Sequence, residues 1–203
     1  MKTPPTAPDA IRWDENGVPY SVHFDDKYFC SENGYADARH VFCDGNSLGE
    51  RFRALDPAQT GTFTIIETGF GTGLDFCTAW QLWDECAPKS WRLHFVSLEL
   101  YPLSPEEMMR ALERWTLLKP YRDALTAQYK PMPKATGAWE FDSGRVRLTV
   151  VFDDVLRALD TIRENGITPD RADAWFLDGF APSKNPEMWE RGVVDAGIEL
   201  CDN

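Results

Sequence analysis

The chain has 203 residues, of which 43% are hydrophobic and 27% are charged, and its formal net charge at pH 7 is −12. This composition is typical of one soluble globular domain and excludes a disordered or a fibrous protein. The acidic surplus argues against nucleic-acid binding by the surface as a whole, because phosphate contacts need Lys and Arg, but it leaves room for a local basic patch.

An N-terminal extension (1–55) is expected to pack on a core (56–203) without forming a domain of its own. Residues 1–20 are rich in proline and polar side chains and are interpreted as an extended lead-in. Residues 21–54 mix aromatic and turn signals, and a short helix is expected over residues 35–42.

Beyond residue 55, short runs of β-forming residues alternate with stretches of helical periodicity. Strands are predicted at residues 63–67, 93–98, 146–152 and 172–177. Helices are predicted at residues 74–83, 105–115, 155–165 and 186–200. Ser104 is the expected N-cap of the second helix, and the proline-containing segment 116–145 is expected to hold a short helix and a loop.

This alternation predicts right-handed βαβ units and an α/β fold with a mostly parallel, Rossmann-like sheet. Helices on both faces of such a sheet explain why the strands are continuous apolar runs. The chain ends one helix after the fourth predicted strand. The further strands of a complete sheet, including an antiparallel edge pair, are therefore expected to be missing, so that the fold is truncated at its C-terminal strands.

A glycine-rich loop follows the first predicted strand. Gly69, Gly71 and Gly73 are spaced Gly-x-Gly-x-Gly, Glu67 precedes them and a helix follows. Dinucleotide-binding loops have the spacing Gly-x-Gly-x-x-Gly, so this spacing favours S-adenosylmethionine. Glu67 would supply negative charge near the cationic part of that cofactor. The alternative interpretation is a flexible glycine turn.

Carboxylates end the next two strands. Glu99 is placed to accept hydrogen bonds from both ribose hydroxyls of a bound cofactor; the alternative is a solvated charge at the strand end. One member of the pair Asp153 and Asp154 is expected to accept from the adenine amino group. The alternative role for this pair is to cap the following helix, and the two roles can belong to different members.

The fourth strand ends at Asp178, which is followed by Gly179 and Phe180. A carboxylate in this position is suited to hydrogen-bond an amine and to take its proton, and Phe180 is suited to stack on a flat ring. The alternative interpretation is a turn aspartate beside a core phenylalanine.

Other features of the sequence indicate neither a metal site nor a membrane segment. The three histidines are spread apart, and the five cysteines show scattered spacings without a CxxC pair, so they are interpreted as reduced thiols. No apolar run approaches the ~18 residues that span a bilayer, and the start of the chain does not resemble a signal peptide. We therefore expect a cytoplasmic protein without a metal ion.

Several segments resemble one family, the MnmC enzymes that modify the wobble uridine of tRNA. The glycine loop, ETGFGTGL, resembles the cofactor loop of their methyltransferase domain, and DAWFLDGFAPSKNPEMW resembles their most distinctive segment. The resemblance also includes FVSLELYPL and the N-terminal stretch around Tyr28, Phe29 and Asn33. It extends from about residue 13 to the end of the chain.

The resemblance implies methyl transfer from S-adenosylmethionine to the 5-aminomethyl group of 2-thiouridine at the wobble position, with tRNA as the substrate. In bifunctional members a FAD-dependent oxidase domain follows, and we expect it to be absent from this chain. By matching positions, the cofactor would be bound by Glu67, Gly69, Phe70, Gly71, Gly73, Glu99 and Asp154. Asp178 would be the catalytic residue, and Phe180, Lys184 and Asn185 would bind the substrate.

Two residues depart from the family pattern. Asp75 stands where asparagine is common, and Leu100 stands where lysine is common; neither is expected to touch the proposed contacts. Three other functions stay open. They are a small-molecule amine methyltransferase, which would suit the acidic surface, a cofactor-binding fragment without catalysis, and an NAD dehydrogenase, which the glycine spacing disfavours.

Overall fold

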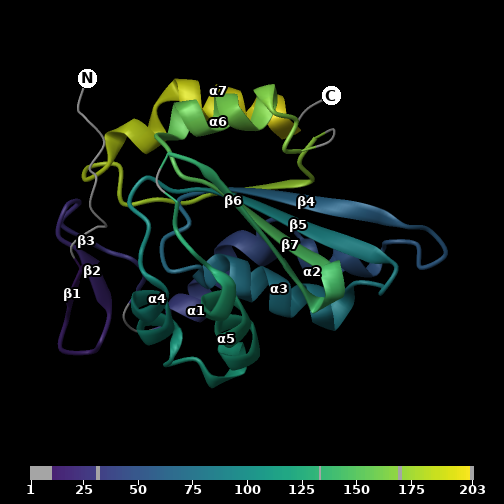
Figure 1. The fold of residues 1–203 in the computed structure, drawn as a ribbon, viewed down its shortest axis with the longest axis horizontal. Helices are drawn as coiled ribbons and strands as arrows, with labels where there is room; N and C mark the ends of the chain where they lie inside the picture. The colour runs from purple at the N-terminus through teal and green to yellow at the C-terminus, as the bar shows by residue number, and fades with distance from the viewer. Residues whose placement is uncertain (1–10, 31–32, 133, 169–170, 202–203) are drawn as a thin grey trace.

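The computed structural model describes residues 11–30, 33–132, 134–168 and 171–201 (Figure 1). Its centre is a five-stranded sheet in the order β6-β7-β5-β4-β8. Four strands run parallel, namely β4 (Gly61–Thr68), β5 (Trp91–Leu98), β7 (Val146–Val151) and β8 (Ala174–Leu177). The predicted Rossmann-like, mostly parallel sheet is thereby confirmed.

Helices cover both faces of this sheet, as Figure 1 shows. One face carries α6 (Val155–Glu164) and α7 (Arg191–Cys201). The other face carries α3 (Leu74–Cys86), α1 (Gly34–Ala38), α2 (Leu48–Arg53), α4 (Pro105–Leu112) and α5 (Lys119–Gln128). The remaining helical turns are η1 (Arg39–Asp44), η2 (Thr116–Leu118), η3 (Asp142–Gly144) and η4 (Pro186–Trp189).

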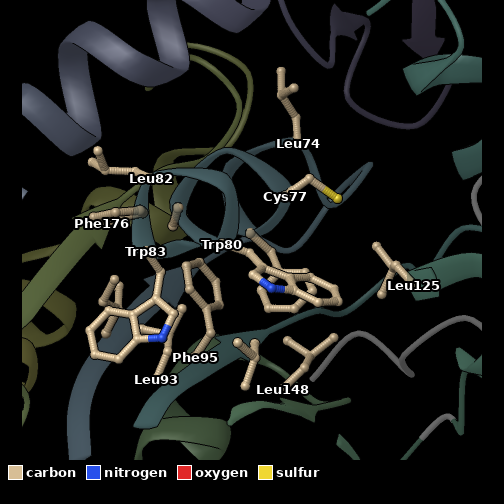
Figure 2. Close-up of a cluster of buried hydrophobic side chains, with 14 of the residues drawn as sticks. Leu74, Cys77, Trp80, Leu82, Trp83, Leu93, Phe95, Leu125, Leu148 and Phe176 are labelled. Atoms are coloured by element: carbon tan, nitrogen blue, oxygen red, sulfur yellow. The ribbon is translucent and has the colours of Figure 1, made fainter. Parts of the chain in front are cut away.

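The central strands are apolar at successive positions because both faces are buried. Ile65 packs into the core under α3, whereas its neighbour Ile66 packs into the core under α6 and α7. Figure 2 shows part of the larger core, to which α3 contributes Trp80 and Trp83 and β5 contributes Phe95. Trp83 is fully buried, and burial of aromatic area on this scale is the main stabilisation of the fold.

The structure corrects the expected loop in 116–145. This segment holds α5 and also strand β6 (Thr136–Phe141), which pairs antiparallel with β7. The sheet therefore has an antiparallel edge strand, and residues ahead of β7 supply it. Only Gly137 and Phe141 of β6 are buried, and so few buried positions leave the segment without a strong strand signal.

The prediction that residues 1–20 form an extended lead-in is corrected for residues 11–20. Residues 1–10 lie outside the part of the chain that the structure describes. Three short strands, β1 (Ile11–Trp13), β2 (Pro19–Ser21) and β3 (Asp26–Lys27), form a separate antiparallel sheet. Further along the extension, Arg51 of α2 donates a hydrogen bond to the carbonyl of Asp173 at 2.8 Å, next to β8.

Helix boundaries differ from the prediction in three places. The helix expected over 186–200 is divided at Glu190, where ψ is 148°, into η4 and α7. The helix expected over 35–42 consists of α1 followed by the wider turn η1. The helix after Ser104 ends at Leu112, and Ser104 caps it as predicted. Within the described residues, no helix has the length and apolarity needed to cross a membrane.

Candidate functional site

A cavity of about 1090 Å³ opens at the carboxyl ends of the parallel strands. The segments after β4, β5, β7 and β8 line it, together with residues from the N-terminal extension. Ligands of open α/β sheets bind at this edge. All the predicted site residues line the cavity except Gly73, which lies behind it at the start of α3.

Backbone hydrogen bonds hold the glycine loop against β5. The N–H groups of Gly69 and Phe70 both donate to the carbonyl of Leu98 at 3.0 Å, and Gly71 N–H donates to Glu99 Oε2 at 2.8 Å. Gly69 has φ of +90°, a conformation that residues with a side chain rarely adopt. The ring of Phe70 is buried against Phe76 and Tyr129, so this side chain packs in the core below the loop.

Glu67 ends β4 and is almost completely buried. Its Oε2 accepts a hydrogen bond from Ser97 Oγ at 2.5 Å. Burial, reinforced by the nearby charge of Asp75, holds the pKa of Glu67 well above its usual range. A cation in the cavity would favour the ionised form of this carboxyl group.

Glu99 is half-buried, and each of its oxygens accepts a backbone hydrogen bond. Oε2 accepts from Gly71, and Oε1 accepts from Tyr101 N–H at 2.7 Å. Glu99 thus couples the glycine loop to the segment after β5. Both oxygens of Glu99 are therefore held at the cavity by backbone amides.

The two aspartates after β7 have different roles. Asp154 caps α6, since its Oδ1 accepts from Leu156 N–H at 3.2 Å, and this confirms the capping interpretation. Asp153 Oδ1 accepts from the N–H of Asp154 at 2.8 Å. Both residues line the cavity, and an adenine contact by Asp154 stays a prediction.

Asp178 follows β8 and is anchored through its backbone. Its N–H donates to Thr68 Oγ1 at 3.1 Å, and Thr68 Oγ1 donates to its carbonyl at 2.9 Å. Desolvation raises the pKa of the Asp178 carboxyl group to about 6; the negative charge of Glu99 adds to this rise, and the N–H of Gly179 opposes it. A carboxylate with this pKa is suited to exchange a proton near neutral pH.

Aromatic rings from distant segments gather at the rim of the cavity. Phe180 stacks on Phe24 with ring centroids 4.6 Å apart, and Tyr28 meets Phe180 edge-on at 5.0 Å. Tyr101 Oη lies 2.9 Å from His23 Nε2. Of these rings, only Phe180 was predicted to lie in the site, since no local pattern indicates that residues 23–28 fold onto the loop after β8.

The loop that carries the other predicted substrate residues is tied to the same N-terminal segment. Lys184 and Asn185 line the cavity. Lys184 forms an ion pair with Asp25, and Ala181 N–H donates to Asp26 Oδ2 at 3.0 Å. The extension therefore shapes one wall of the site.

The two residues that depart from the family pattern also lie at the cavity. Asp75 and Leu100 both line the cavity. Asp75 is 8% exposed, and its Oδ2 is enclosed without a hydrogen-bond partner. Within the described ranges, no cluster of three or more His, Cys, Asp or Glu side chains is arranged to hold a metal ion.

Comparison with known proteins defines the class. Residues 117–202 match a family described as S-adenosyl-L-methionine-dependent methyltransferase. A crystal structure of MNMC2 from Aquifex aeolicus superposes with a TM-score of 0.69, covering 98% of this chain and 58% of that chain at 19% identity. The fold is Rossmann-like, and residues 117–202 are similar to the S-adenosyl-L-methionine-dependent methyltransferases.

Three sequence relatives bear one name, tRNA 5-methylaminomethyl-2-thiouridine biosynthesis bifunctional protein MnmC. Identity is 47% with the Methylobacillus flagellatus protein, 48% with that of Pseudomonas syringae pv. tomato and 45% with that of Chromobacterium violaceum. These matches cover 96%, 88% and 92% of this chain. The chain is thus a homologue of MnmC. It spans 29%, 26% and 27% of the relatives' own lengths.

Proposed function

We propose that this chain transfers a methyl group from S-adenosylmethionine to the 5-aminomethyl group of 2-thiouridine at the tRNA wobble position. The observation that carries the proposal is the position of Asp178 at the wall of the cavity that the glycine loop borders, where desolvation raises the pKa of its carboxyl group to about 6. The relatives named for tRNA 5-methylaminomethyl-2-thiouridine biosynthesis support this choice of substrate.

The residues of the cavity suit the proposed cofactor. Its sulfonium and α-ammonium groups carry positive charge, and Glu67 and Asp75 are acidic groups that line the cavity. Glu99 lies at the end of β5, where a carboxylate can accept from ribose hydroxyls, and Asp153 and Asp154 lie at the end of the neighbouring strand. S-adenosylmethionine supplies an electrophilic methyl group when bound.

Asp178 performs the proton transfer in the proposed reaction. An ammonium has no lone pair, so the substrate must lose a proton to the carboxylate before its nitrogen attacks the methyl carbon. The bond from nitrogen to carbon forms as the bond from carbon to sulfur breaks. The remaining catalysis comes from holding the two reactants in line away from water.

The aromatic rings at the rim of the cavity are suited to bind a flat substrate. Phe180 and Phe24 already stack, and Tyr28 lies against Phe180, so a planar base can enter among rings that favour stacking. Lys184 and Asn185 border the same side of the cavity. We propose that these two residues and Phe180 contact the modified nucleotide.

The substitution Asp178→Asn tests the catalytic role. The side chain keeps its size but no longer accepts a proton, so turnover should fall by about 10²- to 10⁴-fold. Cofactor affinity should stay nearly unchanged. Turnover is measured as labelled methyl transfer to tRNA that bears 5-aminomethyl-2-thiouridine, and affinity by calorimetric titration. Asp160→Asn, on the exposed side of α6, is the matched control; undiminished turnover of Asp178→Asn would exclude the role.

A small-molecule amine methyltransferase is the second candidate, and the net charge of −12 favours it. Phosphates are repelled by an acidic surface, whereas a free amine is not. The same assay separates the two functions when the tRNA is replaced by the free modified nucleoside. Methylation of the nucleoside without methylation of the tRNA would support the small-molecule function.

A further inference from the structure

Asp75 is a buried carboxyl group that the proposed reaction does not use. It lies in the first turn of α3, is 8% exposed and lines the cavity, and its Oδ2 is enclosed without a donor. Titratable groups of the neighbouring elements surround Asp75. They are Glu67 near the end of β4, Asp178 after β8 and the thiol of Cys43 in η1. Glu99, after β5, interacts with Glu67 and Asp178.

Asp75 and Glu67 differ in their hydrogen bonds. The hydroxyl of Ser97 donates to Glu67, and such a bond favours an ionised carboxylate. Asp75 has no such donor, and burial together with the charge of Asp178 holds its pKa well above the usual range. Asp75 is therefore a buried carboxyl group at the cavity with a raised pKa and no donor on its enclosed oxygen.

The lysines that line the cavity do not neutralise this cluster, because each is paired elsewhere. Lys27 Nζ lies 3.0 Å from Asp14 Oδ2, and Lys184 is paired with Asp25. A positive charge brought into the cavity by a ligand would favour the ionised form of Asp75, because a nearby opposite charge stabilises a carboxylate.

We propose that Asp75 is a specificity residue that releases its proton when the cationic cofactor binds and regains a proton once the cofactor has lost its methyl group. The inference rests on the proposed function. Methyl transfer moves the positive charge from sulfur to the substrate nitrogen, and the substrate leaves with that charge. A neutral thioether then remains, and Asp75 no longer has a cation beside it. The cavity thereby holds the methyl donor more tightly than the spent product.

Calorimetric titration with S-adenosylmethionine and with S-adenosylhomocysteine tests the proposal. Each titration is run at pH 7 in two buffers with different protonation enthalpies, so that the number of protons released is obtained along with the dissociation constant. The wild-type protein should release protons with the methylated ligand and release fewer with the demethylated one. In Asp75→Asn this difference should shrink, and the preference for the methylated ligand should fall several-fold. Asp160→Asn should behave as wild type.

The outcomes separate this proposal from the proposed function. If both ligands bind but Asp75→Asn releases as many protons as wild type, the role of Asp75 is excluded and the cofactor assignment stands. If the wild-type protein binds neither ligand, the cofactor assignment and the role of Asp75 both fail. Asp75→Ser provides a second neutral variant in case Asp75→Asn does not fold.

Discussion

Gly73 shows how a single residue supports the site without lining it. Its φ is +76°, and a Cβ there would lie 2.9 Å from Leu125 Cδ2 and 3.0 Å from Met108 Cε. The glycine allows the loop to turn into α3 while α4 and α5 pack closely against the turn. A cofactor contact by Gly73 stays a prediction, and the structure shows that this glycine shapes the loop.

Gly73→Ala should destabilise the protein by about 2–4 kcal/mol, because the left-handed backbone and overpacking both carry a cost. Gly166→Ala is the matched control, since its φ is +57° and a Cβ there meets nothing within 4 Å. The control should lose only about 1 kcal/mol. Urea-unfolding free energies of the two variants provide the measurement, and equal losses would show that the packing contact is unimportant.

Among the secondary-structure elements, α4 has the most complete set of N-terminal capping interactions. Ser104 Oγ accepts from Glu107 N–H at 3.2 Å, and Glu107 Oε2 accepts from Ser104 N–H at 2.8 Å. This capping box follows from residues three positions apart, so the N-terminus of the helix was predictable. The C-terminus was not, because the helix ends at Leu112 without a glycine.

Ser104→Ala should cost about 1 kcal/mol of stability, since two backbone donors at the start of α4 depend on the capping box. Thr161→Ala in α6 is a suitable comparison. The hydroxyl of Thr161 donates to the carbonyl of Arg157 within the same helix, and its loss should change stability little. Thermal unfolding monitored by circular dichroism distinguishes the two; similar melting temperatures would contradict the role of the cap.

For the whole molecule, the buried carboxyl groups link stability to pH. The folded protein holds the protons of Glu67, Asp75 and Asp178 more tightly than the unfolded chain. Unfolding therefore releases protons, and the contribution of these groups to stability falls as pH rises above about 4, the unfolded value. Burial lowers the pKa of His94 to about 4. The contribution of His94 to stability therefore rises with pH until the pH reaches the usual pKa of histidine.

Asp75→Asn removes one carboxyl group together with its effect on the pKa of Glu67, and the contribution of His94 cancels in the difference between variant and wild type. The variant should gain stability relative to wild type, and the gain should be larger at pH 8 than at pH 5. Unfolding free energies from urea titration at the two pH values give the comparison. A gain that does not depend on pH would mean that Asp75 is ionised in the folded protein.

The strands, the helices that follow them and the glycine loop were determined by the sequence itself. Each depends on local signals, namely apolar runs, capping residues and glycine spacing. The ends of the strands are local as well, so Glu67, Glu99 and Asp178 were predicted at one edge of the sheet, and the structure brings them to one cavity.

The remaining features were decided only by the tertiary structure. Strand β6 is a strand because its hydrogen bonds go to β7, and Phe24 reaches Phe180 because residues far apart in the chain fold together. The pKa of Asp75 is raised because the surrounding protein excludes water from it and because Asp178, which follows β8, brings negative charge close to it. Sheet pairing and desolvation both depend on partners distant in sequence, and a local pattern does not contain them.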